Sequence, residues 1–354
     1  MKGRAVYLDS LPDERRIAAL FEDGQLSDVI VDPTGAPDAG PGAIFRARMG
    51  RPMKGQGGAI VALTQTENGF LREAKGLAPG APVLVQVSTV AEPGKAPPVT
   101  RRILFKSRYA IVTPGKPGFN ISRTIRDEER RVALMEIAEA AMDGADADLG
   151  LILRSSAEVG DLDAVADDAS AMRALAEAVL GDADTAAPAL LVDAPDAHHL
   201  AWREWGHPDL LDDTPGCFAA AGVWDALRDA LSPRVGLPVG ASMYVEPTRA
   251  LVAVDVNTGP DTSPAAGLKA NVAALRALPR ALRVRGLAGQ IIVDLAPFPK
   301  RDRTQLEQVL KSALRAERAE ITLAGWTPLG HMELQAKRER QPLIRGIADV
   351  LPDL

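Results

Sequence analysis

Short apolar runs that end in turn-forming residues mark two strands in the C-terminal third of the chain. Residues 251–254 read LVAV and are soon followed by Thr258-Gly259-Pro260, while residues 291–293 read IIV and are followed by Pro297. Between them, residues 269–287 carry Leu, Ala and Arg at helical spacing. This pattern predicts a strand, a helix and a second strand, with the two strand ends side by side.

Polar side chains follow both predicted strands. Asp255 and Asn257 are two positions apart, so on an extended chain they face the same way, and Asp294 ends the second strand. Carboxylates at neighbouring strand ends are what a Mg²⁺ site on an α/β sheet needs, because Mg²⁺ takes one or two carboxylates and keeps room for water and phosphate. The alternatives are a turn in which Asp255 and Asn257 satisfy the loop backbone, and a strand that merely ends in a polar residue at Asp294.

Residues 43–110 show short apolar alternations separated by Gly and Pro, which predicts about five short strands and a small barrel of OB type. Such barrels bind single-stranded nucleic acid with aromatic and basic side chains. The available aromatic residues are Phe45, Phe70 and Tyr109, and the available basic residues are Arg101, Arg102, Lys106 and Arg108. For each aromatic residue the alternative is core packing.

The segments 1–38, 122–192 and 195–235 show weaker patterns. Residues 1–38 contain a strand, a helix-compatible stretch and an apolar run, too little to fold alone, so they should pair with a later segment. Residues 122–192 predict helix, strand, helix and strand in that order. Residues 195–235 give no clear pattern, and we place the adjacent His198 and His199 there in a surface loop.

Composition narrows the class of protein. With 354 residues and 46% hydrophobic content the chain can hold two or three domains. No apolar run approaches the roughly 18 residues that cross a bilayer, and the first residues lack a signal-peptide core, so we expect a cytoplasmic protein. The single Cys217 excludes an internal disulfide and a multi-cysteine zinc site within one chain, and we expect it to be a small buried residue.

The net charge of −6 is unevenly distributed. Residues 265–345 hold 15 Lys and Arg against 7 Asp and Glu, whereas residues 136–196 are strongly acidic. A phosphate polymer would avoid the acidic segment and gather at the basic one. A solvated helical face is the alternative reading for much of the basic segment.

Three segments, in order, resemble the catalytic half of the RNase E/G family of single-strand endoribonucleases. They read LPVGASMYVEPTRALVAVDVNTG, then ANVAALRALPRALRVRGLAGQIIVDL, then WTPLGHMELQAKRERQPL. The resemblance covers nearly the whole chain, is strong over residues 236–343 and is weaker over residues 193–235, where the chain is shortened. In the family the first segment carries a catalytic Asp with an Asn two residues on, and the second carries the other metal-binding Asp. Those positions are Asp255, Asn257 and Asp294 here.

The resemblance implies a multidomain α/β fold. Its expected parts are an RNase-H-like part at 1–38, an S1-type OB domain at 39–112, a 5′-sensor-like subdomain at 113–192, a shortened second RNase-H-like part at 193–248, and a DNase-I-like catalytic subdomain at 249–354. It also implies one Mg²⁺ held by Asp255 and Asp294, with Mn²⁺ as a possible substitute, and cleavage of single-stranded RNA to 5′-phosphate and 3′-hydroxyl ends in rRNA or mRNA processing. The expected RNA-binding residues are Phe70, Arg101, Arg102, Lys106, Lys337 and Arg338.

At several positions this sequence departs from the family pattern, and these departures change how we expect it to bind RNA. The 5′-end pocket falls on Arg154 and Ser155, but the family's opposing Arg aligns with Glu320, which would repel a phosphate unless Arg318 substitutes. One of the two stacking aromatics of the barrel becomes Ile60, and the other is Phe70. We therefore expect weaker or altered RNA binding and no preference for 5′-monophosphates.

Relatives continue into a paired-cysteine segment that shares zinc between two chains, and then into a small dimerising domain. The given sequence has neither, so we expect no zinc, no zinc-linked dimer, and either a monomer or another oligomer. Two other functions stay open. A non-catalytic RNA-binding protein would not need clustered carboxylates, and a small-molecule phosphohydrolase would leave the barrel unexplained.

Overall fold

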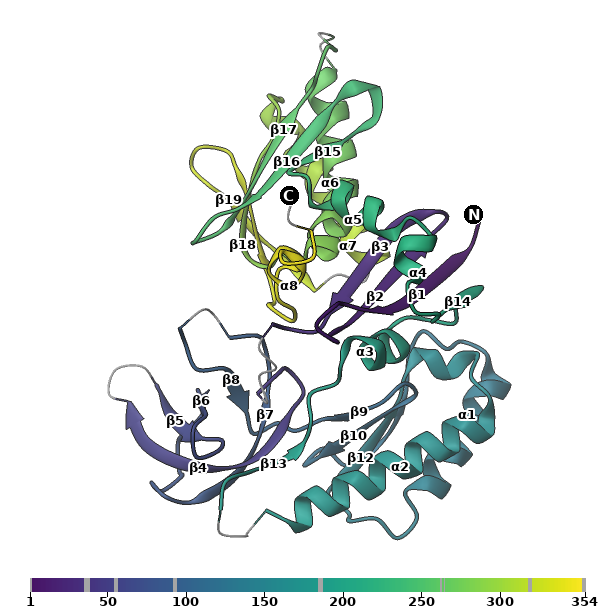
Figure 1. Ribbon diagram of the computed structural model, residues 1–354, viewed down its shortest axis with the longest axis vertical. Helices are drawn as coiled ribbons and strands as arrows, with labels where there is room; N and C mark the ends of the chain where they lie inside the picture. Colours follow the sequence, from purple (N-terminus) through teal and green to yellow (C-terminus); the bar gives the residue numbers. More distant parts are fainter. Residues whose placement is uncertain are drawn as a thin grey trace. The chain divides into compact units, whose positions relative to one another are not determined.

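The computed structural model describes residues 2–34, 39–53, 57–91, 94–183, 187–261, 263, 265–317 and 320–351. The chain forms two compact units, coloured along the sequence in Figure 1. The first unit comprises Met1–Ala36, Asp196–His198 and His207–Leu354, and the second comprises Pro37–Pro195 and His199–Gly206. Among the described residues, no helix has both the length and the apolar character needed to cross a membrane.

The N-terminal segment of the first unit forms a small sheet with a later segment, as expected. Its strands are β1 (Arg4–Ser10), β2 (Arg16–Glu22), β3 (Gln25–Val31) and β14 (Leu210–Asp212), in the order β14-β1-β2-β3. The stretch that looked helix-compatible is the strand β2, which lies between two partners with Ile17 to Leu20 all buried. Pairing on both edges outweighs the helical propensity of its Ala, Leu and Arg residues.

Two short helices, α4 (Cys217–Ala220) and α5 (Val223–Leu231), pack on this sheet. Cys217 is buried as expected, and burial raises the pKa of its thiol to about 11. The helix α8 (Leu343–Ile347) contributes Leu343 and Ile347 to the same core.

The C-terminal sheet of the first unit contains the predicted strand–helix–strand arrangement. Its six strands run in the order β15-β16-β17-β18-β20-β19. Their bounds are β15 (Arg234–Gly236), β16 (Ser242–Pro247), β17 (Val252–Asn257), β18 (Gly289–Asp294), β19 (Ile321–Trp326) and β20 (Met332–Ala336). The helices α6 (Ala266–Arg285) and α7 (Arg303–Ala316) bury their apolar residues against the sheet, with the short helices η2 (Pro238–Gly240) and η3 (Lys300–Asp302) in the connections. The α6 helix ends at Gly286, whose φ of 62° is left-handed and needs glycine.

A small β-barrel occupies the first part of the second unit and is consistent with an S1-like domain. Its strands are β4 (Ile44–Met53), β5 (Gly58–Ala62), β6 (Asn68–Leu71), β7 (Pro82–Val87) and β8 (Pro98–Thr100), and the pairing of β4 with β7 closes the barrel. The strand β13 (Ala189–Val192) adds to β4 from outside. The expected domain boundary at 112 stays a prediction, but the next described strand after Thr100, Phe105–Lys106, already belongs to the next sheet.

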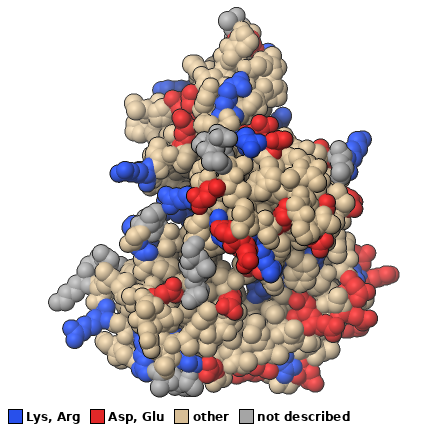
Figure 2. Space-filling model, in the orientation of Figure 1, with Lys and Arg blue, Asp and Glu red and all other residues tan. Residues whose placement is uncertain are grey.

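The rest of the second unit is an α/β subdomain. Its strands are β9 (Phe105–Lys106), β10 (Ala110–Pro114), β11 (Gly118–Ile121) and β12 (Leu149–Leu153), in the order β11-β12-β10-β9. The helices α1 (Glu128–Ala141) and α2 (Leu162–Gly181) start at Asp127 and Asp161, whose side chains accept hydrogen bonds from the first-turn backbone. Figure 2 shows the carboxylates of these two helices gathered on the surface.

The segment 195–235, which carried no clear sequence pattern, begins with the helix α3 (Ala197–Glu204). His198 and His199 therefore lie on a helix, and their placement in a surface loop was wrong. His198, which belongs to the first unit, has its Nε2 within hydrogen-bond distance of the carbonyl oxygens of Asp9 and Ile17 in that unit.

Candidate active site

Two aspartates stand on adjacent positions of neighbouring strands. The strands β17 and β18 pair in parallel, and the register places Asp255 directly beside Asp294. Neighbouring strands lie about 4.8 Å apart, so the two carboxylates rise side by side. Both are exposed, because the apolar residues that alternate with them face α6 and α7 on the other side of the sheet. The predicted convergence of the two acidic strand ends is thus confirmed.

Each aspartate has a polar neighbour that orients it. Asn257 Nδ2 donates a 2.7 Å hydrogen bond to Asp255 Oδ2, as expected for side chains two positions apart on one strand. His331 Nδ1 lies 3.1 Å from Asp294 Oδ1. The sequence reading missed His331, which lies in the third matching segment but has no spacing that relates it to a site. Its only signal is its position directly before β20, the strand that pairs with β18.

The loop that carries His331 is fixed locally. His331 N donates to Thr327 Oγ1 at 3.0 Å, and Thr327 N donates to the carbonyl oxygen of His331 at 2.9 Å. These two bonds close a tight turn between β19 and β20. The backbone of this turn therefore positions the His331 imidazole beside Asp294.

The backbone after Asp294 is clamped from α6. Asn271 is fully buried, its Nδ2 donates to the carbonyl oxygen of Ala296 at 2.8 Å, and its Oδ1 accepts from Ala296 N at 2.9 Å. A Cβ at Gly267 would lie 2.1 Å from the carbonyl oxygen of Pro297, so only glycine allows the first turn of α6 to approach this closely. Both contacts hold the strand end that carries Asp294.

The carboxylate pair fits a hard divalent cation. Within the described part of the chain, no group of three or more His, Cys, Asp or Glu side chains is arranged to hold a metal ion. Two adjacent exposed carboxylates are nonetheless the donor set that Mg²⁺ commonly uses, because it retains several water ligands. The contact with His331 engages one oxygen of Asp294, which leaves the other oxygen available.

The predicted RNA-binding residues do not all lie near the carboxylates. Lys337 and Arg338 follow the far end of β20, about 20 Å along the strand from His331. The Lys337 ammonium pairs with Glu339 at 3.0 Å, and the Arg338 guanidinium packs against Gly289. The expectation that they contact RNA stays a prediction.

On the barrel, Phe70 is half-buried and lies opposite Ile60 in the β5–β6 pair, while Arg101 and Arg102 are exposed after β8. The roles of these residues in RNA binding also stay predictions. Phe45 and Tyr109, by contrast, are buried, so core packing is the correct reading for both.

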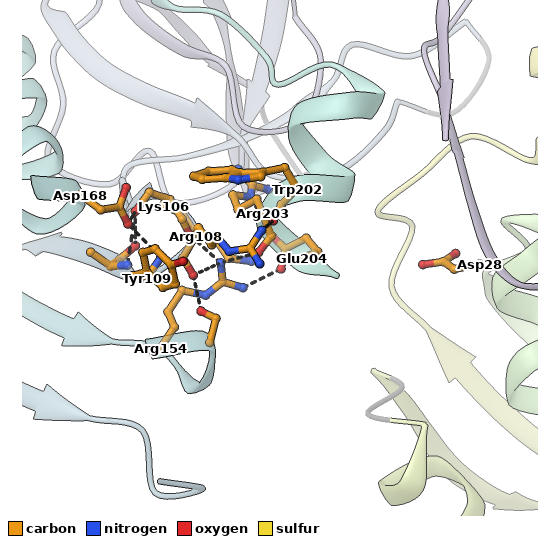
Figure 3. A network of polar contacts seen from close by, with 12 residues as sticks. Asp28, Lys106, Arg108, Tyr109, Arg154, Asp168, Trp202, Arg203 and Glu204 are labelled. Atoms are coloured by element: carbon orange, nitrogen blue, oxygen red, sulfur yellow. Dashed lines mark hydrogen bonds and ion pairs between the residues drawn. The ribbon is translucent and has the colours of Figure 1, made fainter. Parts of the chain in front are cut away.

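A cluster of cations surrounds Glu204 in the second unit (Figure 3). The carboxylate of Glu204 pairs with Lys106 at 2.8 Å, with Arg154 at 2.6 Å and with Arg203 at 2.8 Å. Burial alone would raise the pKa of Glu204, but the hydrogen bond from Lys106 and the charges of the arginines outweigh it and lower the pKa to about 2. Two of these groups, Lys106 and Arg154, are residues that the sequence reading assigned to RNA.

Arg154, expected in the 5′-end pocket, therefore forms an ion pair with Glu204 of the same unit. Its guanidinium also donates to the carbonyl oxygens of Ser107 and Arg203, while Ser155 starts the short helix η1 (Ser155–Glu158). Glu320 is exposed just before β19, and Arg318 lies outside the described residues. The assignment of Arg154 and Ser155 to a 5′-end pocket stays a prediction.

Comparison with known proteins gives one consistent family. A model described as "Ribonuclease E/G family" matches residues 105–212 and 207–339. Ribonuclease E of Nostoc sp. is 30% identical over 97% of this chain, and ribonuclease E of Synechocystis sp. is 27% identical over 97%. Ribonuclease G of Haemophilus influenzae is 25% identical over 99% of the chain and 83% of its own length. The chain spans 57% and 58% of the length of the two cyanobacterial relatives.

Proposed function

We propose that this chain, which belongs to the ribonuclease E/G family, is a Mg²⁺-dependent endoribonuclease that cuts single-stranded RNA in rRNA or mRNA processing or decay. The observation that carries the proposal is the pairing of Asp255 with Asp294 on the open face of the C-terminal sheet. A protein that only binds RNA has no use for two adjacent carboxylates that repel phosphate when no cation is present.

In this proposal Asp255 and Asp294 hold the cation. When bound, Mg²⁺ would activate a water for in-line attack and neutralise the charge that develops on the scissile phosphate. Asn257 donates to one oxygen of Asp255 and so fixes the orientation of a carboxylate that would hold the cation. His331 Nδ1, which contacts Asp294 Oδ1, would fix the orientation of that carboxylate. Cleavage would leave a 5′-phosphate and a 3′-hydroxyl, and the 2′-hydroxyl need not react.

We further propose that cleavage does not depend on a 5′-monophosphate. The support is the pairing of Arg154 with Glu204, because an arginine already bound to a carboxylate has to give up that partner before it can bind a phosphate. The measurement is the ratio of kcat/KM for two RNAs that differ only in a 5′-monophosphate or a 5′-hydroxyl. We expect a ratio near one, and a ratio above ten would contradict this part of the proposal.

The test of the main proposal is cleavage of a short fluorescent single-stranded RNA in Mg²⁺ by the wild type, Asp255→Asn and Asp294→Asn. Each substitution keeps the side-chain shape and removes the charge that binds the cation, so we expect a loss of at least 100-fold in rate. The matched control is Glu246→Gln on β16, because Glu246 lies on the same open face but beside Ala253 rather than beside the aspartates. Equal cutting by all four proteins would show that the site is wrong.

A second readout separates catalysis from binding. Mn²⁺ binding by calorimetry should weaken in Asp255→Asn and Asp294→Asn and stay unchanged in Glu246→Gln. RNA binding without cleavage in either Mg²⁺ or Mn²⁺ would instead favour a non-catalytic RNA-binding protein on the same scaffold. Turnover of mononucleotides or simple phosphate esters would favour a phosphohydrolase.

A further inference from the structure

Trp202 is a large aromatic side chain that stays on the surface. It lies on α3, and 47% of its surface is exposed although its helical neighbour Ala201 is buried. Nearly half of this side chain is therefore open to solvent. The sequence reading assigned no role to this residue.

The packed face of the ring rests on an arginine. The Arg108 guanidinium carbon lies 5.3 Å from the centre of the Trp202 ring and 5.6 Å from the centre of the Tyr109 ring. Arg108 also donates to the carbonyl oxygen of Trp202 at 2.6 Å. The order is thus Tyr109, Arg108, Trp202 (Figure 3). The His199 ring also packs against the indole ring, at 5.7 Å between centroids and a tilt of 58°.

This stack is built on rigid parts. Arg108 is only 6% exposed, and its guanidinium is held by the hydrogen bond to the Trp202 carbonyl oxygen. The backbone N–H of Tyr109 donates to Asp168 Oδ2 at 2.8 Å, and its carbonyl oxygen accepts from Arg154 N at 2.8 Å. An indole ring held from below in this way loses little freedom when something stacks on its outer face.

The charge around the ring favours a polyanion. Four cations meet two carboxylates in the cluster beneath Trp202, which leaves an excess of two positive charges. The cations are Lys106, Arg108, Arg154 and Arg203, and the carboxylates are Asp168 and Glu204. The helices α1 and α2 of the same unit carry mainly carboxylates on their surface, so they would repel RNA (Figure 2).

We propose that Trp202 is a stacking platform for one unpaired nucleobase of single-stranded RNA. An exposed aromatic ring beside an excess of cations is how proteins bind single strands without reading sequence, since every base offers a flat face. The platform would make up for the stacking position that the barrel has lost at Ile60. The proposal deepens the proposed ribonuclease function, on which it rests for its substrate class.

The experiment measures binding without cleavage, so its outcome is separate from that of the cleavage assay. The full chain in EDTA is titrated with a fluorescent single-stranded oligouridylate of about ten nucleotides and with an abasic ribose-phosphate oligomer of the same length. The variants are Trp202→Ala and Trp202→Phe. The control is Val159→Ala, because Val159 is an exposed apolar residue of the same unit.

Stacking is worth about 1 to 3 kcal/mol per base, so Trp202→Ala should weaken binding of oligouridylate by about 5-fold to 150-fold. It should leave binding of the abasic oligomer unchanged. Trp202→Phe should keep most of the affinity, and oligouridylate should quench the tryptophan fluorescence of the wild type more than that of Trp202→Phe. The control should bind as the wild type does.

Two outcomes would overturn the proposal. One is a wild type that binds the normal and the abasic oligomers equally well, and this comparison needs no variant to fold. The other is a Trp202→Ala protein that melts like the wild type and binds oligouridylate with unchanged affinity. A chain that fails to cut RNA but still distinguishes the two oligomers would refute the nuclease proposal and leave the platform standing.

Discussion

The clamp between Asn271 and Ala296 is the contact through which the fold most directly fixes a candidate metal ligand. Asn271→Ala would remove both hydrogen bonds at once and leave the buried N–H and C=O of Ala296 without partners. Each orphaned buried group costs about 1 to 3 kcal/mol, so the expected loss of stability is about 2 to 6 kcal/mol. That is a large share of the 5 to 15 kcal/mol that stabilises a typical domain.

The functional consequence follows from the distance along the chain. Ala296 lies two residues after Asp294, so a strand end released at Ala296 no longer fixes the direction of that carboxylate. Removing a group that orients a metal ligand typically lowers metal affinity by 10-fold to 100-fold. We therefore expect Asn271→Ala to lower the melting temperature in circular dichroism by several degrees and to weaken Mn²⁺ binding in calorimetry.

The control for this experiment is Arg276→Ala, an exposed position on the same helix that keeps a strong helix former. It should change neither the melting temperature nor Mn²⁺ binding. If Asn271→Ala melts and binds Mn²⁺ like the wild type, the clamp does not position Asp294. If it loses stability but keeps its Mn²⁺ affinity, the clamp stabilises the fold but does not orient Asp294 for metal binding.

Two further predictions concern Glu204 and His331. Because the folded state lowers the pKa of Glu204 from 4.5 to about 2, its ion pairs contribute full stability above about pH 4.5 and lose it as the pH falls towards 2. This contribution is at most about 3 kcal/mol, because solvent screens a side chain that is 25% exposed. Glu204→Gln should thus flatten the dependence of melting temperature on pH between 4.5 and 2, and a variant that falls as steeply as the wild type would contradict the assignment. For His331→Leu we expect about 10-fold weaker Mn²⁺ binding at an unchanged melting temperature, because only the orientation of Asp294 is lost, and His207→Leu, at an exposed histidine, should bind Mn²⁺ normally.

The parts of the site that the sequence predicted are those whose geometry is local. Asp255 and Asn257 face the same way because a strand has a period of two, and the turn after each apolar run places its acid at a strand end. The position of Asp294 beside Asp255 needs only one further rule, that a strand–helix–strand unit makes parallel neighbours. These inferences depend on segments of no more than about 45 residues, and the structure confirms them.

The parts that the sequence did not predict depend on contacts between distant residues. His331 meets Asp294 because β20 pairs with β18 in the antiparallel sense, which no spacing in the sequence encodes. The α3 helix is eight residues long, too short for a helical period to stand out, and within the second unit its position depends on the contact between Arg108 and Trp202. The strand β2 was wrongly predicted to be helix-compatible. Its own residues favour a helix, but its pairing with β1 and β3 outweighs that propensity.

The pairing of β17 with β18 depends both on local sequence pattern and on contacts between distant residues. Its register decides whether the two aspartates meet to form a site. Val252, Val254, Ile291 and Val293 point towards α6 and α7, and the acids point the other way only because they alternate with these residues. A slip of one residue in β18 would bury Asp294 under the helices and expose Val293. The apolar residues that build the core therefore also set the position of the carboxylates, and this is why a hydrophobic pattern was enough to predict a pair of acids.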